Sequence, residues 1–595
     1  MPVAELPHGR YLTCAYQILP EAGGQTRAML MRARILAELG GRPQEVLTLG
    51  PVPDSGRRRA GLLEQGALSE AIGTRNLYDH YREHGWGDEP PGDPLPDLSA
   101  HVIEEQPRED GSVLRVVYRS PATGRKVYDY LRADGTPYLR VAAHQYSRPR
   151  SGPGSILRVG AGGRVCGQFA NLRAWHRRWL RELTPEDERV FVFTDSRYVL
   201  PHLAPLSDPR MRLLYQMHNL HLKPAARRWD GPLASGYTRV LARAGDVDAF
   251  VTLTARQRDE IALRRGRTSN MHVVANPVTV PAPPEPWPPR DPLRATVIAR
   301  LSTQKQVAHA VAAWAQVVAA VPGARLDVYG DGPERDAVVA AIAEHGMGEA
   351  VALRGFDPGA RDSLWTSSAL LLTSVYEGYP LSTLEAMARG CPVVAYDVRY
   401  GPREQVADGV DGFVVPDGDP AALAARVVEL LQAPELVARM SVAARETARR
   451  HDAGGFLREW AQVIAAADRD GAKRPRVKAV RLSVERLEEA GTGRLARAAG
   501  RTPRVEAAGT VAIEQRGRPR GLRDATLELA WVDPASGAVT DVPVAFRRGG
   551  GALRFTASAP LPDAPAALRL RLLWRAYAWD RLLRDPEGTI PSGSG

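Results

Sequence analysis

The chain of 595 residues is 44% hydrophobic and 25% charged, a composition typical of a soluble globular protein. Its length is too great for one core and predicts about three or four domains. The sequence has no uninterrupted apolar run of about 18 residues and no basic start followed by an apolar core, so we expect neither a membrane-spanning helix nor a secretion signal.

Charge and cysteine content restrict the partners and the compartment. The formal net charge of +11 favours an anionic partner, which could be nucleic acid, acidic lipid or a phosphate-bearing polymer. Nucleic acid is the least favoured, because the basic residues are dispersed and no recognised reader motif occurs. Cys14, Cys166 and Cys391 are the only cysteines, an odd number that argues against a disulfide framework or a cysteine metal site. We expect a cytoplasmic protein, with peripheral contact at the inner face of the cell membrane as an open alternative.

The first half of the chain predicts an α/β domain with an insertion. A strand at 11–16, the glycine pair Gly23-Gly24 and a helix at 27–39 open the domain. Paired alternating strands then interrupt this rhythm, which resumes with strands at 190–193, 249–252 and 271–274. We therefore predict a Rossmann-like domain over residues 1–98 and 166–278, with a β-rich insertion at 99–165.

The second half predicts a linker and two further domains. Proline at the density found in residues 279–292 is expected to join neither sheet nor helix, which indicates an interdomain linker. Short apolar strands then alternate with helices over 293–470 and predict a second Rossmann-like domain. Apolar and polar residues alternate in residues 475–595, as they do in β-strands, and predict an accessory β-sandwich-like domain. The predicted fold class is α/β, with two doubly wound domains facing a cleft.

The stretch from Glu377 to Val394 is the most informative part of the sequence. It contains two carboxylates, Glu377 and Glu385, that are separated by seven residues including a Gly-Tyr-Pro break. The pattern Ser382-x-x-Glu385 could be a capping box that satisfies backbone donors of its own helix. That interpretation leaves Glu377 unexplained, so the pair also predicts a ligand site at a loop-to-helix junction.

Other polar residues follow neighbouring strands of the same predicted sheet. Arg300 and Lys305 follow the first strand and could clamp a diphosphate through charge-assisted bonds. Gly332 lies in a glycine turn after the next strand, although such turns are common. Ligands of doubly wound folds bind at the carboxyl ends of the strands, so convergence at this edge favours one binding site.

These elements resemble the retaining, nucleotide-sugar-dependent glycosyltransferases of the GT-B architecture, in the family with the E-x7-E motif (glycosyltransferase family 4). The resemblance extends over about residues 23–415 in the expected order. The matching elements are Gly23-Gly24, Met217-His218-Asn219, Asn276-Pro277-Val278, Arg300 with Lys305, Gly330-Asp331-Gly332, Glu377 to Glu385, and 408–415.

The resemblance implies roles for these residues. Arg300 and Lys305 would neutralise the leaving diphosphate, Glu385 would bind the ribose hydroxyls, and Glu377 would hold the donor sugar. His218 would face the reacting centre, with His221 three residues on as a competitor. The implied catalytic set is His218, Glu377, Arg300 and Lys305. The implied donor-binding set is Gly24, Arg300, Lys305, Gly332, Glu377, Gly378, Tyr379, Leu381, Ser382 and Glu385. Neither a metal nor another cofactor is expected.

A narrower resemblance concerns the acceptor. The segment 395–404 and the β-rich insertion are similar to the poly(glycerol-phosphate) α-glucosyltransferases of wall teichoic acid, in which the insertion resembles an oligomerisation element. This implies transfer of glucose or N-acetylglucosamine from a UDP-sugar to an anionic polyol-phosphate polymer, and a homo-oligomer. The accessory domain at 475–595 is not part of the usual pattern.

Two alternatives remain open at this point. The same donor chemistry could act on a membrane lipid or another polysaccharide, and a lipid acceptor predicts a basic amphipathic helix, for which 172–181 is the candidate. A non-catalytic carbohydrate-binding protein is the alternative from another class. The presence of Glu377, Glu385, Arg300 and Lys305 together argues against it.

Overall fold

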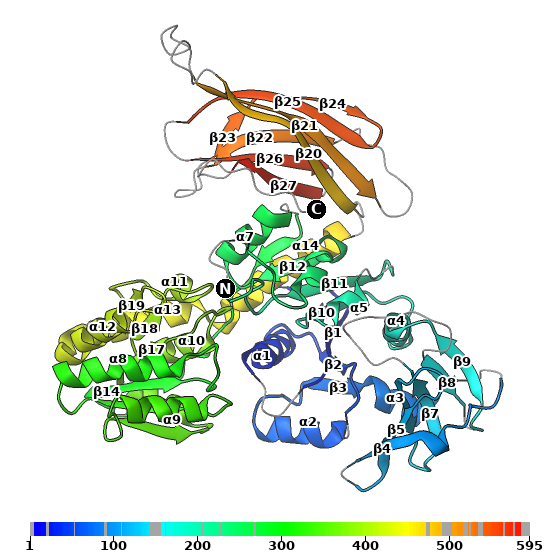
Figure 1. The fold of residues 1–595 in the computed structure, drawn as a ribbon, viewed down its shortest axis with the longest axis horizontal. Coiled ribbons are helices and arrows are strands. Elements are labelled where there is room, and N and C mark those ends of the chain that lie inside the picture. Colours follow the sequence, from blue (N-terminus) through cyan, green and yellow to red (C-terminus); the bar gives the residue numbers. More distant parts are fainter. Residues whose placement is uncertain are drawn as a thin grey trace.

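Figure 1 shows the architecture of the computed structural model, in which two parallel sheets, an inserted antiparallel sheet and a terminal sandwich follow one another along the chain. The structure describes residues 5–18, 23–52, 54–87, 92–108, 110–142, 156–160, 162–204, 206, 208–224, 229, 231–265, 269–471, 477–490, 503–515, 522, 525–532, 539–562, 566–574 and 577–584.

The first domain is built on a seven-stranded sheet in the order β13-β12-β11-β10-β1-β2-β3, and each neighbouring pair is parallel. Its central strands are buried along their whole length, as expected where helices cover both faces of a parallel sheet. The strands are β1 (Arg10–Ala15), β2 (Gln44–Thr48), β3 (Ile72–Asn76), β10 (Val190–Thr194), β11 (Met211–Gln216), β12 (Ala249–Thr252) and β13 (Met271–Val273).

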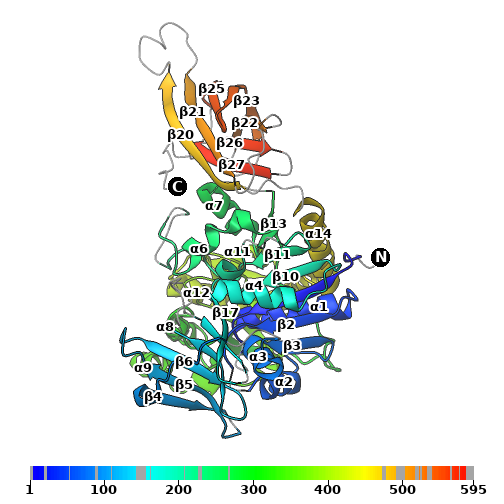
Figure 2. The same ribbon diagram turned by 90° about the vertical axis from the view of Figure 1, so that its right-hand side faces the viewer.

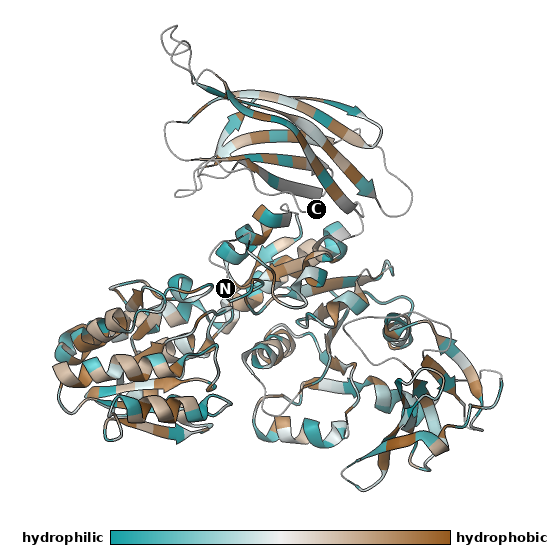
Figure 3. Cartoon of the chain, in the orientation of Figure 1, coloured by the Kyte–Doolittle hydropathy of each residue, from teal (hydrophilic) through white to brown (hydrophobic). Residues whose placement is uncertain are grey.

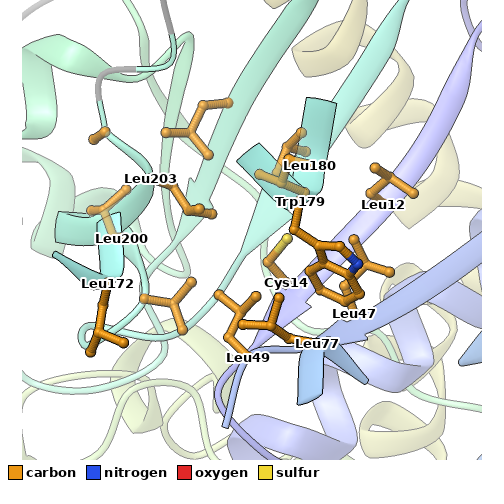
Figure 4. Close-up of a cluster of buried hydrophobic side chains, with 14 of the residues drawn as sticks. Leu12, Cys14, Leu47, Leu49, Leu77, Leu172, Trp179, Leu180, Leu200 and Leu203 are labelled. Atoms are coloured by element: carbon orange, nitrogen blue, oxygen red, sulfur yellow. The ribbon is translucent and has the colours of Figure 1, made fainter. Parts of the chain in front are cut away.

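Helices of the first domain cover this sheet. They are α1 (Gly24–Glu38), α2 (Ser55–Glu64), α3 (Leu77–His84), α4 (Leu172–Glu182), α5 (Leu200–Leu203), α6 (Tyr237–Leu241) and α7 (Ala255–Arg265), with 3-10 turns η1 (Ser99–His101) and η2 (Ala244–Asp246). Figure 4 shows part of the main core, in which Trp179 of α4 packs beside Cys14 and Leu47 of the sheet.

Helix α4 corrects one expectation. Its apolar side chains, among them Trp175, Trp179 and Leu180, are fully buried in the core of the first domain. A helix whose apolar face is already covered by protein cannot place that face in a membrane interface. The prediction that 172–181 forms a membrane-facing helix is therefore wrong. Of the helices that the structure describes, none combines the length and apolarity that a bilayer span requires.

The insertion forms a six-stranded antiparallel sheet in the order of the chain, from β4 to β9. Its strands are β4 (Val102–Pro107), β5 (Val113–Arg119), β6 (Lys126–Leu131), β7 (Pro137–Val141), β8 (Ile156–Val159) and β9 (Val165–Phe169). The predicted boundary at 165 falls at the start of β9, so the sheet extends to Phe169. Tyr130 and Tyr138 share one core cluster with β1, which makes the insertion continuous with the first domain. Homo-oligomerisation through this sheet stays a prediction.

The second domain contains a six-stranded parallel sheet in the order β16-β15-β14-β17-β18-β19. Its strands are β14 (Asp291–Ile298), β15 (Arg325–Tyr329), β16 (Val351–Gly355), β17 (Ser367–Leu372), β18 (Val393–Tyr396) and β19 (Gly412–Val415). Its helices are α8 (Val307–Ala320), α9 (Arg335–Glu344), η3 (Ala360–Trp365), α10 (Leu381–Ala388), α11 (Pro402–Gln405), α12 (Pro420–Gln432) and α13 (Pro434–Arg450). Strand β14 begins inside the predicted linker, because Asp291 already pairs with Ser367.

Helix α14 (Ala453–Gly471) returns to the first domain, although the sequence placed residues up to 470 in the second. Its Phe456, Trp460 and Ile464 share a core cluster with Tyr11 and Phe193 of the first sheet. Trp460 is fully buried, and its ring packs edge-on against Phe193 at 5.6 Å between ring centres. Helix α14, which follows the second domain in the chain, therefore packs on the first domain and connects the two.

The terminal domain is a sandwich of two four-stranded antiparallel sheets, β20-β21-β25-β24 and β23-β22-β26-β27. Its strands are β20 (Val477–Ala490), β21 (Arg504–Gln515), β22 (Ala525–Val532), β23 (Val539–Val542), β24 (Val544–Gly549), β25 (Ala552–Pro560), β26 (Ala567–Trp574) and β27 (Tyr577–Arg584). Figure 3 shows the alternation of apolar and polar residues along these strands, which produces one core between the sheets. In Figures 1 and 2 the sandwich lies over α7, and Arg581 of β27 donates to the Arg264 carbonyl oxygen.

We expect Trp460→Ala to destabilise the first domain by about 3–5 kcal/mol, the usual effect of truncating a buried aromatic side chain. Chemical denaturation of the full chain would measure this change. Val442→Ala is the matched control, because Val442 of α13 is 73% exposed and its loss should change stability by less than about 0.5 kcal/mol. Equal stability of the two variants would contradict the packing of α14 on the first sheet.

Candidate active site

Glu377 lies in the loop after β17 and is held by side chains from neighbouring strand ends. Its Oε1 accepts hydrogen bonds from Lys305 Nζ at 2.5 Å and from Ser374 Oγ at 2.6 Å, and only 6% of the residue is exposed. Its backbone exchanges two hydrogen bonds with Arg399 and Tyr400, at 2.7 and 2.8 Å. The carboxylate is thus fixed in position beside an ammonium group.

The loop after β14 supplies the cations. The carbonyl oxygen of Lys305 accepts a hydrogen bond from Thr373 Oγ1 at 2.9 Å, which joins this loop to the end of β17. The Lys305 side chain is one-fifth exposed, and the Arg300 side chain in the same loop is exposed to solvent. The sequence placed both cations at this edge, and the structure brings Lys305 into contact with Glu377.

Glu385 does not cap its helix. Helix α10 begins at Leu381, and its N-terminal flanking residue is Pro380, which has no side chain able to accept a hydrogen bond. Glu385 Oε1 instead forms ion pairs with Arg27 of α1 at 2.5 Å and with Arg361 of η3 at 3.0 Å. The capping-box interpretation is therefore wrong, because Glu385 projects from the helix toward cations of both domains.

Two predicted glycines occupy different surroundings. Gly332 has a positive φ of 156°, and a Cβ there would lie 2.2 Å from the Leu301 carbonyl oxygen. Only glycine therefore lets the turn after β15 contact the loop that carries Arg300. Gly24 is the first residue of α1 and is exposed, and a Cβ added there would meet no atom within 4 Å.

The remaining predicted donor residues lie around the start of α10. Tyr379 turns its side chain away into the core of the second domain, where its hydroxyl lies 3.3 Å from His451 Nε2. Its carbonyl oxygen accepts a hydrogen bond from Asn276 Nδ2 at 3.2 Å. Leu381 and Ser382 are half-buried in the first turn of α10.

The backbones of the two domains meet at Gly378. A Cβ on Gly378 would lie 1.7 Å from the carbonyl oxygen of His218 in the first domain. No side chain fits in that space, so the glycine lets the backbones of the two domains meet. This contact places the Glu377 loop beside the segment that follows β11.

His218 is oriented by a buried ion pair. Its Nε2 lies 2.6 Å from Asp195 Oδ1, and Arg32 of α1 binds both oxygens of Asp195 at 2.7 Å. Burial would raise the pKa of Asp195, but the Arg32 charge and the bond from His218 outweigh it and hold this pKa at about 2. Asp195 is thus an anion at neutral pH, and it fixes the His218 ring.

The competing histidine, His221, has a different environment. It is fully buried and stacks on the Tyr400 ring with the ring centres 6.2 Å apart. Burial and the nearby charges of Arg264 and Arg399 lower the pKa of His221 to about 3, so this ring is neutral at pH 7. The Tyr400 hydroxyl donates to Glu260 of α7 at 2.6 Å. His221 is therefore part of the packing between the domains.

A cavity of about 260 Å³ opens beside His218. It is bounded by side chains of both domains, including Asp195, Arg197 and Tyr237 of the first and Gln304 and Tyr376 of the second. Tyr376, Gln304 and Asn219, which line the cavity, are the chain neighbours of three predicted catalytic residues, Glu377, Lys305 and His218. Charged, amide and hydroxyl side chains line it beside leucine, proline and alanine side chains, so it offers hydrogen-bonding groups to a hydrophilic ligand.

Sequence reasoning missed four charged residues of the site, namely Arg27, Arg32, Asp195 and Arg361. Asp195 follows β10 directly, so the rule that ligands gather at the carboxyl ends of parallel strands would have indicated it. The arginines carried no such signal, because each lies within a helix or turn of an arginine-rich chain and meets its partner only across the tertiary structure.

Parts of the chain are similar to known protein sequences. Residues 285–447 match the family model described as glycosyl transferases group 1. The chain is 26% identical over 286 residues to the poly(glycerol-phosphate) alpha-glucosyltransferase of Bacillus subtilis, covering 48% of this chain and 42% of the relative. It is 32% identical over 322 residues to an exopolysaccharide phosphotransferase of Streptomyces coelicolor, covering 53% of this chain and 32% of that one. The matches thus span less than half the length of these curated relatives.

The fold is shared over a longer span. A crystal structure of Staphylococcus aureus TarM in complex with fondaparinux, α-GlcNAc-glycerol and UDP superimposes with a TM-score of 0.59, covering 77% of this chain and 99% of that one at 16% identity. This likeness shows that the two parallel-sheet domains form a GT-B fold, as the sequence predicted. The terminal sandwich contributes two antiparallel sheets beyond them.

We expect Gly378→Ala to separate the two domains, because the new Cβ would overlap the His218 carbonyl oxygen. A displacement of about 1 Å at a reacting centre can lower a rate by about 100-fold, and small-angle scattering should show a more open molecule. Gly348→Ala is the control, because a Cβ there meets no atom within 4 Å. Unchanged scattering by Gly378→Ala would contradict the close approach.

We expect Asp195→Asn to destabilise the first domain by about 3–5 kcal/mol, because it leaves the Arg32 charge buried without its partner. Urea denaturation followed by tryptophan fluorescence would measure this loss. The control is Glu429→Gln, which removes an exposed pair with Arg426 and should change stability by less than about 1 kcal/mol. If Asp195→Asn were no less stable than the control, the Arg32 pair would not support the fold.

Proposed function

We propose that this protein is a glycosyltransferase that moves glucose or N-acetylglucosamine from a UDP-sugar to a poly(polyol-phosphate) chain of the teichoic-acid type. The observation that carries the proposal is the Lys305–Glu377 pair, which is held at the carboxyl end of one parallel sheet and precedes Gly378, whose backbone meets that of His218 in the other domain. The match of residues 285–447 to glycosyl transferases group 1 supports the reaction class.

The donor half of the reaction depends on the second domain. Lys305 and Arg300 would neutralise the charge that develops on the departing diphosphate, and a charge-assisted bond to such a group stabilises it by about 1.5–3 kcal/mol. Glu377 would orient the sugar hydroxyls. Glu385 would bind the ribose hydroxyls, exchanging part of its contact with Arg27 and Arg361 for the nucleotide.

The acceptor half depends on the cavity beside His218. Asp195 holds the ring by one edge, which leaves the other ring nitrogen to contact a hydroxyl of the acceptor. Positioning a hydroxyl against the sugar in this way can supply a large part of the rate. The similarity to a poly(glycerol-phosphate) alpha-glucosyltransferase supports a polyol-phosphate as the source of that hydroxyl.

We extend the proposal to retention of the anomeric configuration without a metal, as in glycosyltransferase family 4. Asp195 is the one carboxylate among the described residues that line the cavity. Because both of its oxygens are bound by Arg32 and its pKa is about 2, it is a weak base and a poorly placed nucleophile. The departing phosphate would then take the acceptor proton on the same face of the sugar, with Lys305 and Arg300 balancing its charge.

A cytoplasmic location fits this proposal. The three cysteines form no disulfide in the structure, which is usual for proteins of a reducing compartment. No observation of the structure favours a lipid acceptor, since the helix expected to face a membrane is buried in the core.

The test uses the purified full chain with UDP-glucose or UDP-N-acetylglucosamine and poly(glycerol phosphate). We expect UDP release and incorporation of sugar into the polymer. Lys305→Gln should lower kcat by about 10- to 100-fold, the effect of losing one charge-assisted bond. Lys126→Gln should have no effect, because Lys126 is an exposed residue of the inserted sheet. Neither transfer nor donor hydrolysis by the wild type would overturn the proposal.

A further inference from the structure

Arg197 is a charged residue of the cavity that the donor chemistry does not use. It lies two residues after Asp195 in the loop that follows β10. Its guanidinium carbon lies 5.0 Å from the centre of the Tyr198 ring and 5.5 Å from that of the Tyr237 ring, and its Nη2 donates to the Tyr198 hydroxyl at 3.0 Å. The guanidinium is thus held between two aromatic rings at the wall of the cavity.

This guanidinium has no carboxylate partner in the described part of the chain. Among the described residues no Asp or Glu forms an ion pair with Arg197, and its side-chain hydrogen-bond partners are the hydroxyls of Tyr198 and Tyr237. The adjacent Asp195 already binds Arg32 and His218. A half-buried guanidinium with unused donors favours an oxyanion, and its planar donors match phosphate geometry.

Further arginines lie beyond the cavity. Arg197 and Tyr198 also line a second hollow with Arg239 of α6. Arg173 of α4 donates to the carbonyl oxygen of Pro201, which also lines this hollow. Burial and the charges of Arg173, Arg243 and Arg181 lower the pKa of Arg177 to about 10, so like charges are crowded here. Arginines of the loop after β10, of α6 and of α4 thus gather on this side of the first domain, and their charge favours a ligand with repeated negative charges.

We propose that Arg197, together with Arg239, forms a phosphate-binding subsite that holds a phosphodiester of the acceptor chain beside the unit that receives the sugar. This inference rests on the proposed function and deepens it. Recognition of the phosphodiester would make the enzyme select polyol-phosphate chains over neutral glycans and over peptides with free hydroxyls, because those acceptors cannot neutralise the guanidinium.

A purely structural role for Arg197 makes a different prediction. The aliphatic part of Arg197 packs near Gly236, where a Cβ would lie 3.3 Å from Arg197 Cδ. If Arg197 only supported this loop, its replacement would weaken donor hydrolysis and acceptor use to the same extent. A phosphate-binding role affects the acceptor alone.

The experiment compares wild type, Arg197→Gln, Arg197→Lys and the control Arg439→Gln, which changes an exposed residue of α13. Three properties are measured for each: UDP-sugar hydrolysis without acceptor, KM for poly(glycerol phosphate), and direct calorimetric binding of that polymer without donor. We expect Arg197→Gln to raise KM and weaken polymer binding by about 10-fold or more, with hydrolysis within about 2-fold of wild type. Arg197→Lys should restore part of the polymer binding. Added salt should weaken polymer binding by both the wild type and this variant.

The outcomes separate this inference from the proposed function. Transfer to the polymer that is unchanged in Arg197→Gln would overturn the subsite and leave the proposed function standing. An equal loss of hydrolysis and polymer binding would assign Arg197 a structural role and also overturn it. Equal use of the polymer, a neutral glycan and a serine-rich peptide by the wild type would overturn the phosphodiester selectivity. If the wild type showed no donor chemistry, the proposed function would fail, whereas the binding comparison would still decide the subsite.

Discussion

The close approach of Gly378 to the His218 backbone is the constraint on which the site depends. The space there admits no side chain, so the second domain can bring its Glu377 loop against the first only where glycine occurs. The neighbouring contacts reinforce this geometry, because Tyr400 reaches Glu260 across the boundary and Asn276 bonds to the Tyr379 carbonyl oxygen. Backbone contact and hydrogen bonds thus hold the two domains together next to the site.

Ion pairs fix the two carboxylates of the site. The two carboxylates of the E-x7-E motif each bind cations of the protein, Glu377 to Lys305 within one domain and Glu385 to Arg27 across the cleft. A nucleotide-sugar that engaged these groups would compete with existing ion pairs. The free energy needed to break these ion pairs would reduce the net binding free energy of the ligand. The site therefore favours a ligand that can replace both the charges and the hydrogen bonds.

The loop after β10 carries two charged residues with different surroundings. In the first domain Asp195 is neutralised by Arg32 and fixes His218, whereas Arg197 two residues later has no such partner among the described residues. The loop after β10 therefore carries an anion that is paired with a cation, Asp195, and a cation that no described carboxylate pairs with, Arg197. A neutral sugar hydroxyl and a phosphodiester of one acceptor would match these two positions.

Sequence alone determined the fold class, the two Rossmann-like domains, the inserted sheet and the edge where Lys305 and Glu377 meet. These features depend on local periodicity and on the rule that parallel strands place their carboxyl ends together.

Tertiary structure decided the rest. Helix α14 returns to the first domain because Trp460 fills its core, and the apolar face of α4 is buried by packing that its periodicity cannot identify. Glu385 pairs with Arg27 over a separation of 358 residues, and Arg197 has no carboxylate partner among the described residues because Asp195 turns to Arg32. Partners so far apart in sequence leave no local pattern, since their contact depends on how whole domains pack.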